Sequence, residues 1–125
     1  MNTHKKTYLF IICALLLSLF AFSACAGGSD QDKEELGKQV FTQKCASCHS
    51  LEAEQIIVGP SLAHIATTAE GRLADKSARE YVEAMLVDSN TFDLEGFPNI
   101  MPVNMKGQVS AEEYEALVNF LMTQE

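Results

Sequence analysis

The chain has 125 residues, which is enough for one small domain. It carries 17 Asp and Glu against nine Lys and Arg, a formal net charge of −8 at pH 7. This acidic balance argues against nucleic-acid binding, which needs cations for the phosphates. It permits steering towards a positively charged partner, and it also serves simple solubility.

The first 24 residues have the layout of a secretory signal peptide. Lys5 and Lys6 form a short positive region, and residues 8–24 are almost wholly apolar, a short run for a membrane-spanning helix. The segment 22–25, Phe-Ser-Ala-Cys, resembles a bacterial lipobox, although Phe22 replaces the usual Leu. We therefore expect a signal peptide at 1–24 and a lipidated Cys25. The alternative is an uncleaved signal anchor, and both place the domain on the outer face of the membrane.

Residues 25–31 are then predicted to be the lipidated cysteine and a short linker, and residues 32–125 the folded domain. Six Gly/Ser-type linker residues span on the order of 13 Å, so the domain would lie close to the membrane. A first helix is expected over 32–44, with Leu36, Val40 and Phe41 on one face. Gly37 in that helix costs about 1 kcal/mol relative to Ala, which indicates a close crossing with another helix.

Two Ser-x-x-Glu capping boxes predict two more helices. Ser77 and Glu80 begin one that ends near Val87, and Ser110 and Glu113 begin the C-terminal one. Each has an apolar stripe at helical spacing, formed by Tyr81, Val82, Met85 and Leu86 in the first and by Tyr114, Leu117, Val118 and Leu121 in the second. Residues 50–68 and 88–106 are expected to be mostly irregular. No alternating strand pattern is present, so the sequence predicts an all-α domain.

Cys45, Cys48 and His49 form a C-x-x-C-H box, the attachment pattern of a covalent haem c. Each thiol can form a thioether with one vinyl group, and the histidine can supply one axial nitrogen to the iron. The alternatives are a thioredoxin-type pair and half of a zinc site. A zinc site lacks its second pair, because Cys13 and Cys25 lie in the apolar N-terminal stretch. A thioredoxin motif lacks its βαβ context.

The second axial position decides between electron transfer and ligand binding. Met101 and Met105 lie in the irregular segment, where a loop can present a side chain, whereas the other methionines after the box lie on helical stripes. Pro102 stiffens the backbone after Met101. We expect Met101 to be the ligand, with Met105 as the second choice. His64 would give bis-histidine ligation, but a solvated loop histidine is the simpler interpretation.

In this combination and order the residues resemble the monohaem class I cytochromes c, over about residues 36–122. The matching positions are Gly37, Phe41, the box, Gly59-Pro60-Ser61-Leu62, Met101-Pro102 and Phe120-Leu121. The resemblance implies an all-α class I cytochrome c fold packed around one covalent haem c. It also implies a near-perpendicular crossing of the first and last helices at Gly37 and Phe120. In this family the Pro60 carbonyl would orient the axial histidine, and Arg72 is a candidate propionate contact or else a surface arginine.

Residues 81–102 look like the cytochrome c domains of respiratory complexes, such as haem-copper oxidases and the quinol-oxidising alternative complex. The family form often has Pro where Ser89 stands. The resemblance implies a membrane-tethered carrier or complex subunit, not itself an enzyme, that passes single electrons in a respiratory or photosynthetic chain. Its partner would be a quinol-oxidising or terminal-oxidase complex, or a small electron carrier. The alternative is a haem enzyme or gas sensor with an open sixth position, using His64 or Arg72.

Overall fold

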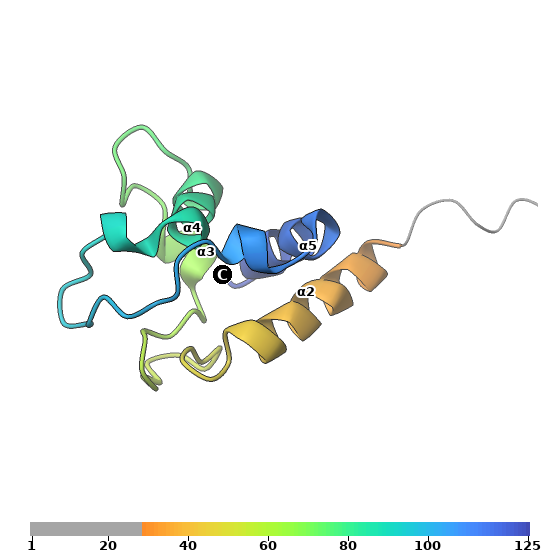
Figure 1. The fold of residues 1–125 in the computed structure, drawn as a ribbon, viewed down its shortest axis with the longest axis horizontal. Coiled ribbons are helices and arrows are strands. Elements are labelled where there is room, and N and C mark those ends of the chain that lie inside the picture. Colours follow the sequence, from red (N-terminus) through yellow and green to blue (C-terminus); the bar gives the residue numbers. More distant parts are fainter. Residues whose placement is uncertain (1–28) are drawn as a thin grey trace, which may run out of the picture.

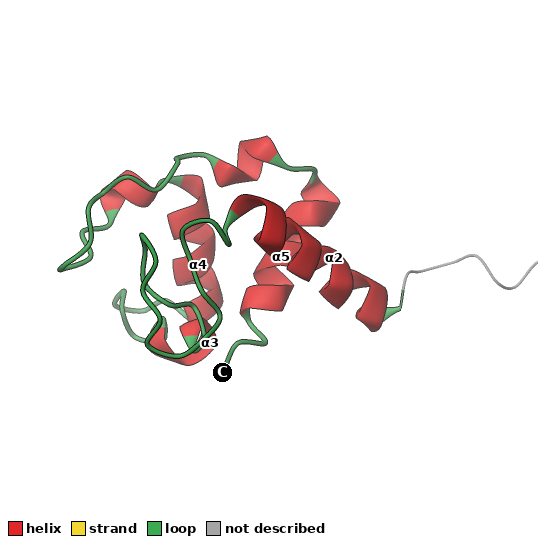
Figure 2. Cartoon of the chain, turned by 90° about the horizontal axis from the view of Figure 1, so that it is seen from below, coloured by secondary structure: helices red, strands yellow, loops and turns green. Residues whose placement is uncertain are grey.

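The computed structural model describes residues 29–125, which form a helical domain (Figures 1 and 2). The α-helices are α2 (Asp30–Lys44), α3 (Ile65–Thr68), α4 (Ala78–Val87) and α5 (Ala111–Leu121), and the 3₁₀ turns are η2 (Ser89–Thr91) and η3 (Met105–Gln108). Over this range the β-pairing consists of one isolated bridge, between His49 and Ile56. The predicted all-α class is confirmed. The predicted signal peptide and Cys25 lie outside the described residues.

Helix α2 begins two residues earlier than predicted, because Ser29 caps it. The Ser29 hydroxyl accepts from the Asp32 backbone N–H at 3.3 Å, and the Asp32 carboxylate accepts from the Ser29 N–H at 2.8 Å. This is a capping box with Asp in place of the usual Glu or Gln. The predicted linker over 25–31 is therefore too long at its C-terminal end, since Asp30 and Gln31 are helical.

Helices α2 and α5 form the most extensive contact between elements; they lie side by side in Figure 1, and one lies across the other in Figure 2. Gly37 is buried at their crossing. A Cβ added there would lie 2.2 Å from the Ala116 carbonyl oxygen and 2.6 Å from Cβ of Phe120. Beside it, the rings of Phe41 and Phe120 pack with centroids 5.9 Å apart. The close helix crossing predicted from Gly37 is confirmed, because no larger side chain fits between these backbones.

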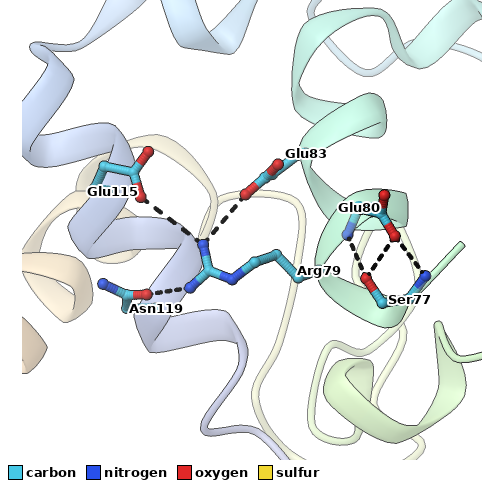
Figure 3. Close-up of polar contacts among 6 residues, drawn as sticks. All are labelled: Ser77, Arg79, Glu80, Glu83, Glu115 and Asn119. Carbon is cyan, nitrogen blue, oxygen red and sulfur yellow. Dashed lines mark hydrogen bonds and ion pairs between the residues drawn. The ribbon is translucent and has the colours of Figure 1, made fainter.

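Both predicted capping boxes are present. In α4 the Glu80 carboxylate accepts from the Ser77 N–H at 2.9 Å (Figure 3). In α5 the Glu113 carboxylate accepts from the Ser110 N–H at 2.7 Å. These bonds satisfy backbone donors that a helix start otherwise leaves without partners, so they fix where each helix begins.

Arg79 connects α4 to α5 (Figure 3). Its guanidinium lies 3.2 Å from the Glu83 carboxylate one turn along α4 and 3.8 Å from Glu115 on α5. It also donates a hydrogen bond to the Asn119 side chain on α5. One cation thus joins two helices that share few other contacts.

The loop after the haem-attachment box contains α3, a single turn that the sequence did not predict. Its Ala66 N–H donates to the Gln124 carbonyl at 3.1 Å, which ties this turn to the C-terminal end of the chain. Within residues 29–125, no helix is both long enough and apolar enough to cross a membrane.

Candidate haem site

A cavity of about 250 Å³ collects the residues of the predicted site from separate parts of the chain. Cys45, Cys48 and His49 come from the turn after α2, Met101 from the loop after η2, and Met105 from the start of η3. The rest of the lining is mainly apolar, with Leu62, Ile65, Val82, Met85, Leu86, Phe92, Leu94, Phe97, Ile100 and Leu121 among its members. A largely apolar cavity bordered by two thiols, an imidazole and thioethers suits an apolar macrocycle that carries a metal.

The His49 ring is held by the loop that follows the box. Its Nδ1 lies 2.8 Å from the Pro60 carbonyl oxygen, which acts as the acceptor when Nδ1 carries the proton. That tautomer leaves the Nε2 lone pair available to a metal. Gly59 makes room for this arrangement, because a Cβ there would lie 2.4 Å from Cε1 of His49.

The same loop folds back over the box through backbone hydrogen bonds. The N–H groups of Val58 and Gly59 both donate to the Cys48 carbonyl, at 3.2 and 2.9 Å. The buried Ser50 hydroxyl accepts from the Glu52 N–H at 2.8 Å, and the Ser50 carbonyl accepts from the Leu62 N–H at the same distance. These bonds close the loop, so the position of Pro60 relative to His49 is built into the backbone.

Cys45 and Cys48 are both partly buried and are not joined by a disulfide. Burial, with a smaller contribution from the neighbouring Cys48, raises the pKa of the Cys45 thiol to about 11. In the folded chain this thiol is therefore protonated at neutral pH.

The two candidate methionine ligands have different surroundings. Met105 is only 5% exposed and belongs to the hydrophobic core, whereas Met101 is partly buried and packs against that core from the loop. Both side chains line the cavity. His64, the other candidate considered, is exposed at the start of α3 and is not part of the lining.

Arg72 borders the cavity next to a tyrosine. Its guanidinium carbon lies 5.7 Å from the centroid of the Tyr81 ring, and one of its nitrogens lies 3.5 Å from the Tyr81 hydroxyl oxygen. Tyr81 itself is buried and packs edge-on against Phe92, with centroids 5.4 Å apart. An arginine and a phenol side by side can both donate hydrogen bonds to a carboxylate.

Residues 34–125 match the family model described as Cytochrome c. This chain belongs to the cytochrome c family. The cytochrome c family binds haem c covalently, and its members transfer electrons through it. Cys45 and Cys48 have the spacing that this attachment requires. A comparison with curated proteins gave no match.

Two residues of this cytochrome c site were not assigned a role from the sequence. Tyr81 looked like a core residue because it lies on the apolar stripe of α4, but its hydroxyl reaches Arg72 at the cavity. Ser89 was noted only as a departure from the family pattern. Its hydroxyl donates to the Met101 carbonyl at 2.9 Å. No local sequence signal could have found this contact, because it joins residues 12 positions apart through the fold.

Proposed function

We propose that this cytochrome c is tethered to a membrane and passes single electrons in a respiratory or photosynthetic chain. It would act as a carrier or as a subunit of a quinol-oxidising or terminal-oxidase complex. The observation that carries the proposal is that the attachment box and two methionines line the same largely apolar cavity. A bound haem supplies a one-electron iron couple, and ligation by histidine and methionine raises its potential and suits electron transfer.

The chain's own residues have distinct roles in this mechanism. Cys45 and Cys48 would hold the cofactor through thioether bonds, and the Pro60 carbonyl keeps His49 in one orientation. Met101 would supply the second axial ligand. Its position supports this assignment over Met105, because Met101 lies in a loop at the cavity whereas Met105 packs in the core. Two protein ligands that stay in place let an electron pass with little structural rearrangement.

Arg72 would contact a propionate group of the haem. It lines the cavity, and its guanidinium lies beside the Tyr81 hydroxyl, so the two could share one carboxylate. A cation at this place would also partly offset the charge of the propionate in a mainly apolar cavity, where an unpaired charge is costly.

The partner would dock where apolar side chains are exposed beside the cavity. Ile100 and Val58 both line the cavity while 64% and 42% exposed, and Ile56, in the same loop as Val58, is 65% exposed. Glu54 and Glu95 are exposed on the same two loops. Exposed apolar side chains and carboxylates on the same loops favour a redox partner that offers both apolar and basic groups, such as a membrane complex or a small carrier.

The proposed location follows from the N-terminal sequence. A lipid on Cys25 would hold the domain at the outer face of the bacterial cell membrane. Because α2 already begins at Asp30, the tether after Cys25 would be only a few residues long. Such a tether keeps the cytochrome near the membrane, so electron donor and acceptor would both be membrane-bound or would come to it.

Visible spectra of the purified holo-protein test the electron-transfer proposal. We expect a low-spin c-type spectrum when oxidised and when reduced, unchanged by carbon monoxide. Rapid carbon monoxide binding by the reduced protein would instead show an open or labile sixth position and would favour a haem enzyme or gas sensor. Met101→Ala should abolish iron–sulfur ligation and lower the reduction potential, and Met105→Ala is its matched control. The reverse result would move the ligand to Met105.

Membrane attachment is tested separately by fractionating cells that express the full chain. Cys25→Ser should release the protein from the membrane fraction or block its processing. Cys13→Ser, a cysteine substitution within the predicted signal, is the control and should leave attachment intact. A Cys25→Ser protein that stays on the membrane with its N-terminal segment uncleaved would show a signal anchor instead of a lipid.

A further inference from the structure

Ser89 is a polar side chain buried at the edge of the haem cavity. It begins the 3₁₀ turn after α4, is only 2% exposed, and lines the cavity. Its Oγ donates a hydrogen bond to the Met101 carbonyl oxygen at 2.9 Å. A buried hydroxyl is costly unless it is hydrogen-bonded. This contact satisfies the Ser89 hydroxyl and also holds the Met101 carbonyl in place.

The Met101 backbone has few hydrogen bonds that hold it in place against the rest of the fold. Pro102 restricts Met101 to extended conformations, but it has no N–H to donate and so does not tie the loop to α4 or η2. In the described chain, three hydrogen bonds join the loop 93–104 to the end of α4 and to η2. Two of them are made by residues of the loop other than Met101. The Asn104 N–H donates to the Val87 carbonyl at 3.0 Å, and the Asn99 side chain donates to the Asn90 carbonyl at 3.4 Å.

The third of these bonds is the one from Ser89, and it reaches Met101 itself. Its donor is buried, so water competes with it less than with the exposed contact at Asn99. The orientation of the Met101 carbonyl sets the direction of the peptide plane next to the side chain that lines the cavity. Loss of the Ser89 hydroxyl would leave that carbonyl without its partner and the loop free to shift.

We propose that Ser89 is a positioning residue, which holds the Met101 backbone through its hydroxyl and thereby sets how easily an external ligand displaces Met101 from the iron. The inference rests on the proposed function, because it requires Met101 to be the axial ligand. It adds that the strength of this ligation is controlled from η2, by a side chain that does not touch the iron.

The test is a titration of the oxidised holo-protein with imidazole, which competes with methionine for the iron. Displacement is followed by loss of the weak red absorption of iron(III)–methionine ligation. Ser89→Ala should bind imidazole about three- to tenfold more tightly than wild type, which corresponds to the usual net contribution of one hydrogen bond. Ser89→Thr and Ser89→Val form an isosteric pair that differs mainly in the hydroxyl, so the Val variant should bind imidazole more tightly than the Thr variant.

A matched control lies two residues away in the same turn. The Thr91 hydroxyl also donates to a backbone carbonyl, that of Asp88 at 2.8 Å, but it is exposed and does not reach the loop. Thr91→Val should therefore keep the imidazole affinity of wild type. Urea unfolding of all variants separates a general loss of stability from a local loosening of Met101.

The outcomes are distinct. Equal imidazole affinity in the Thr and Val variants, or an Ala variant that is less stable to urea yet binds imidazole as wild type does, would overturn the role of Ser89. Met101→Ala shows which proposal has failed. If that variant keeps the red absorption, the ligand assignment is wrong. If it loses the absorption while the Ser89 variants behave as wild type, only the positioning role is wrong.

Discussion

Substitution of Gly37 by alanine tests the helix crossing that shapes this domain. The added Cβ would lie 2.2 Å from the Ala116 carbonyl oxygen, so α2 and α5 must separate by roughly 1 Å to reach an ordinary contact. The obstacle is backbone, which cannot turn aside as a side chain can. Overpacking of this kind costs about 1–3 kcal/mol, and the upper end applies because the most extensive helix contact must open.

The substitution also brings a gain, because Ala is favoured over Gly in a helix by about 1 kcal/mol. The expected net loss in the free energy of unfolding is therefore about 2 kcal/mol, which for a domain of this size lowers Tm by about 10 °C. Thermal and urea unfolding of the holo-protein, followed by far-UV circular dichroism, measure it. Lys38→Ala, at an exposed neighbouring position in α2, is the control and should change stability little. A Gly37→Ala protein as stable as wild type would refute the tight crossing.

The contacts of Gly59, Arg79 and Glu113 can each be tested by substitution. Gly59→Ala should displace the His49 ring, because the new Cβ would lie 2.4 Å from its Cε1; a changed visible spectrum and a lower yield of holo-protein would show it, and a wild-type spectrum would contradict it. Arg79→Ala should cost at most about 1 kcal/mol in urea unfolding, less in high salt, since its ion pairs are solvent-exposed; a larger, salt-independent loss would contradict this. The Ser110 hydrogen bonds lower the pKa of Glu113 in the folded chain, so its stabilising contribution is present above the ordinary Glu value of about 4.3 and is lost as the pH falls below it. Urea midpoints measured from pH 6 to pH 3 should fall less steeply for Glu113→Gln than for wild type, and equal slopes would refute the linkage.

Features written in neighbouring residues were predictable from the sequence. The capping boxes at Ser77 and Ser110 each lie within four residues, and both helices begin where predicted. The capping box at Ser29 was not predicted, because Asp32 occupies the position where Glu or Gln is usual and because the segment has the composition of a linker. The turn α3 was not predicted, because it is a single helical turn whose position depends on a hydrogen bond to Gln124, far away in the sequence. Local sequence patterns therefore predict where helices begin, but not the contacts between residues that are far apart in the sequence.

At the haem site, too, local motifs could be predicted from the sequence, but contacts made through tertiary packing could not. The attachment box was recognisable as a motif, and the hydrogen bond between His49 and the Pro60 carbonyl agrees with what the family resemblance implied. The choice between Met101 and Met105 could only be argued from a neighbouring proline, since the core position of Met105 depends on tertiary packing. The contact between Ser89 and Met101 could not be predicted, because a serine beside a helix end usually makes local hydrogen bonds to nearby backbone groups.

The pairing of α2 with α5 has a consequence for the order of events during synthesis. These helices are the first and the last of the described chain, so α2 lacks its main packing partner until α5 has been made. A helix of 15 residues is only marginally stable by itself in water. The attachment box, which directly follows α2, would therefore remain in an open chain until α5 has been made and can pack against α2. Its thiols would meet the haem-attachment machinery before the domain closes, and a chain shortened within α5 would lack the partner that completes closure.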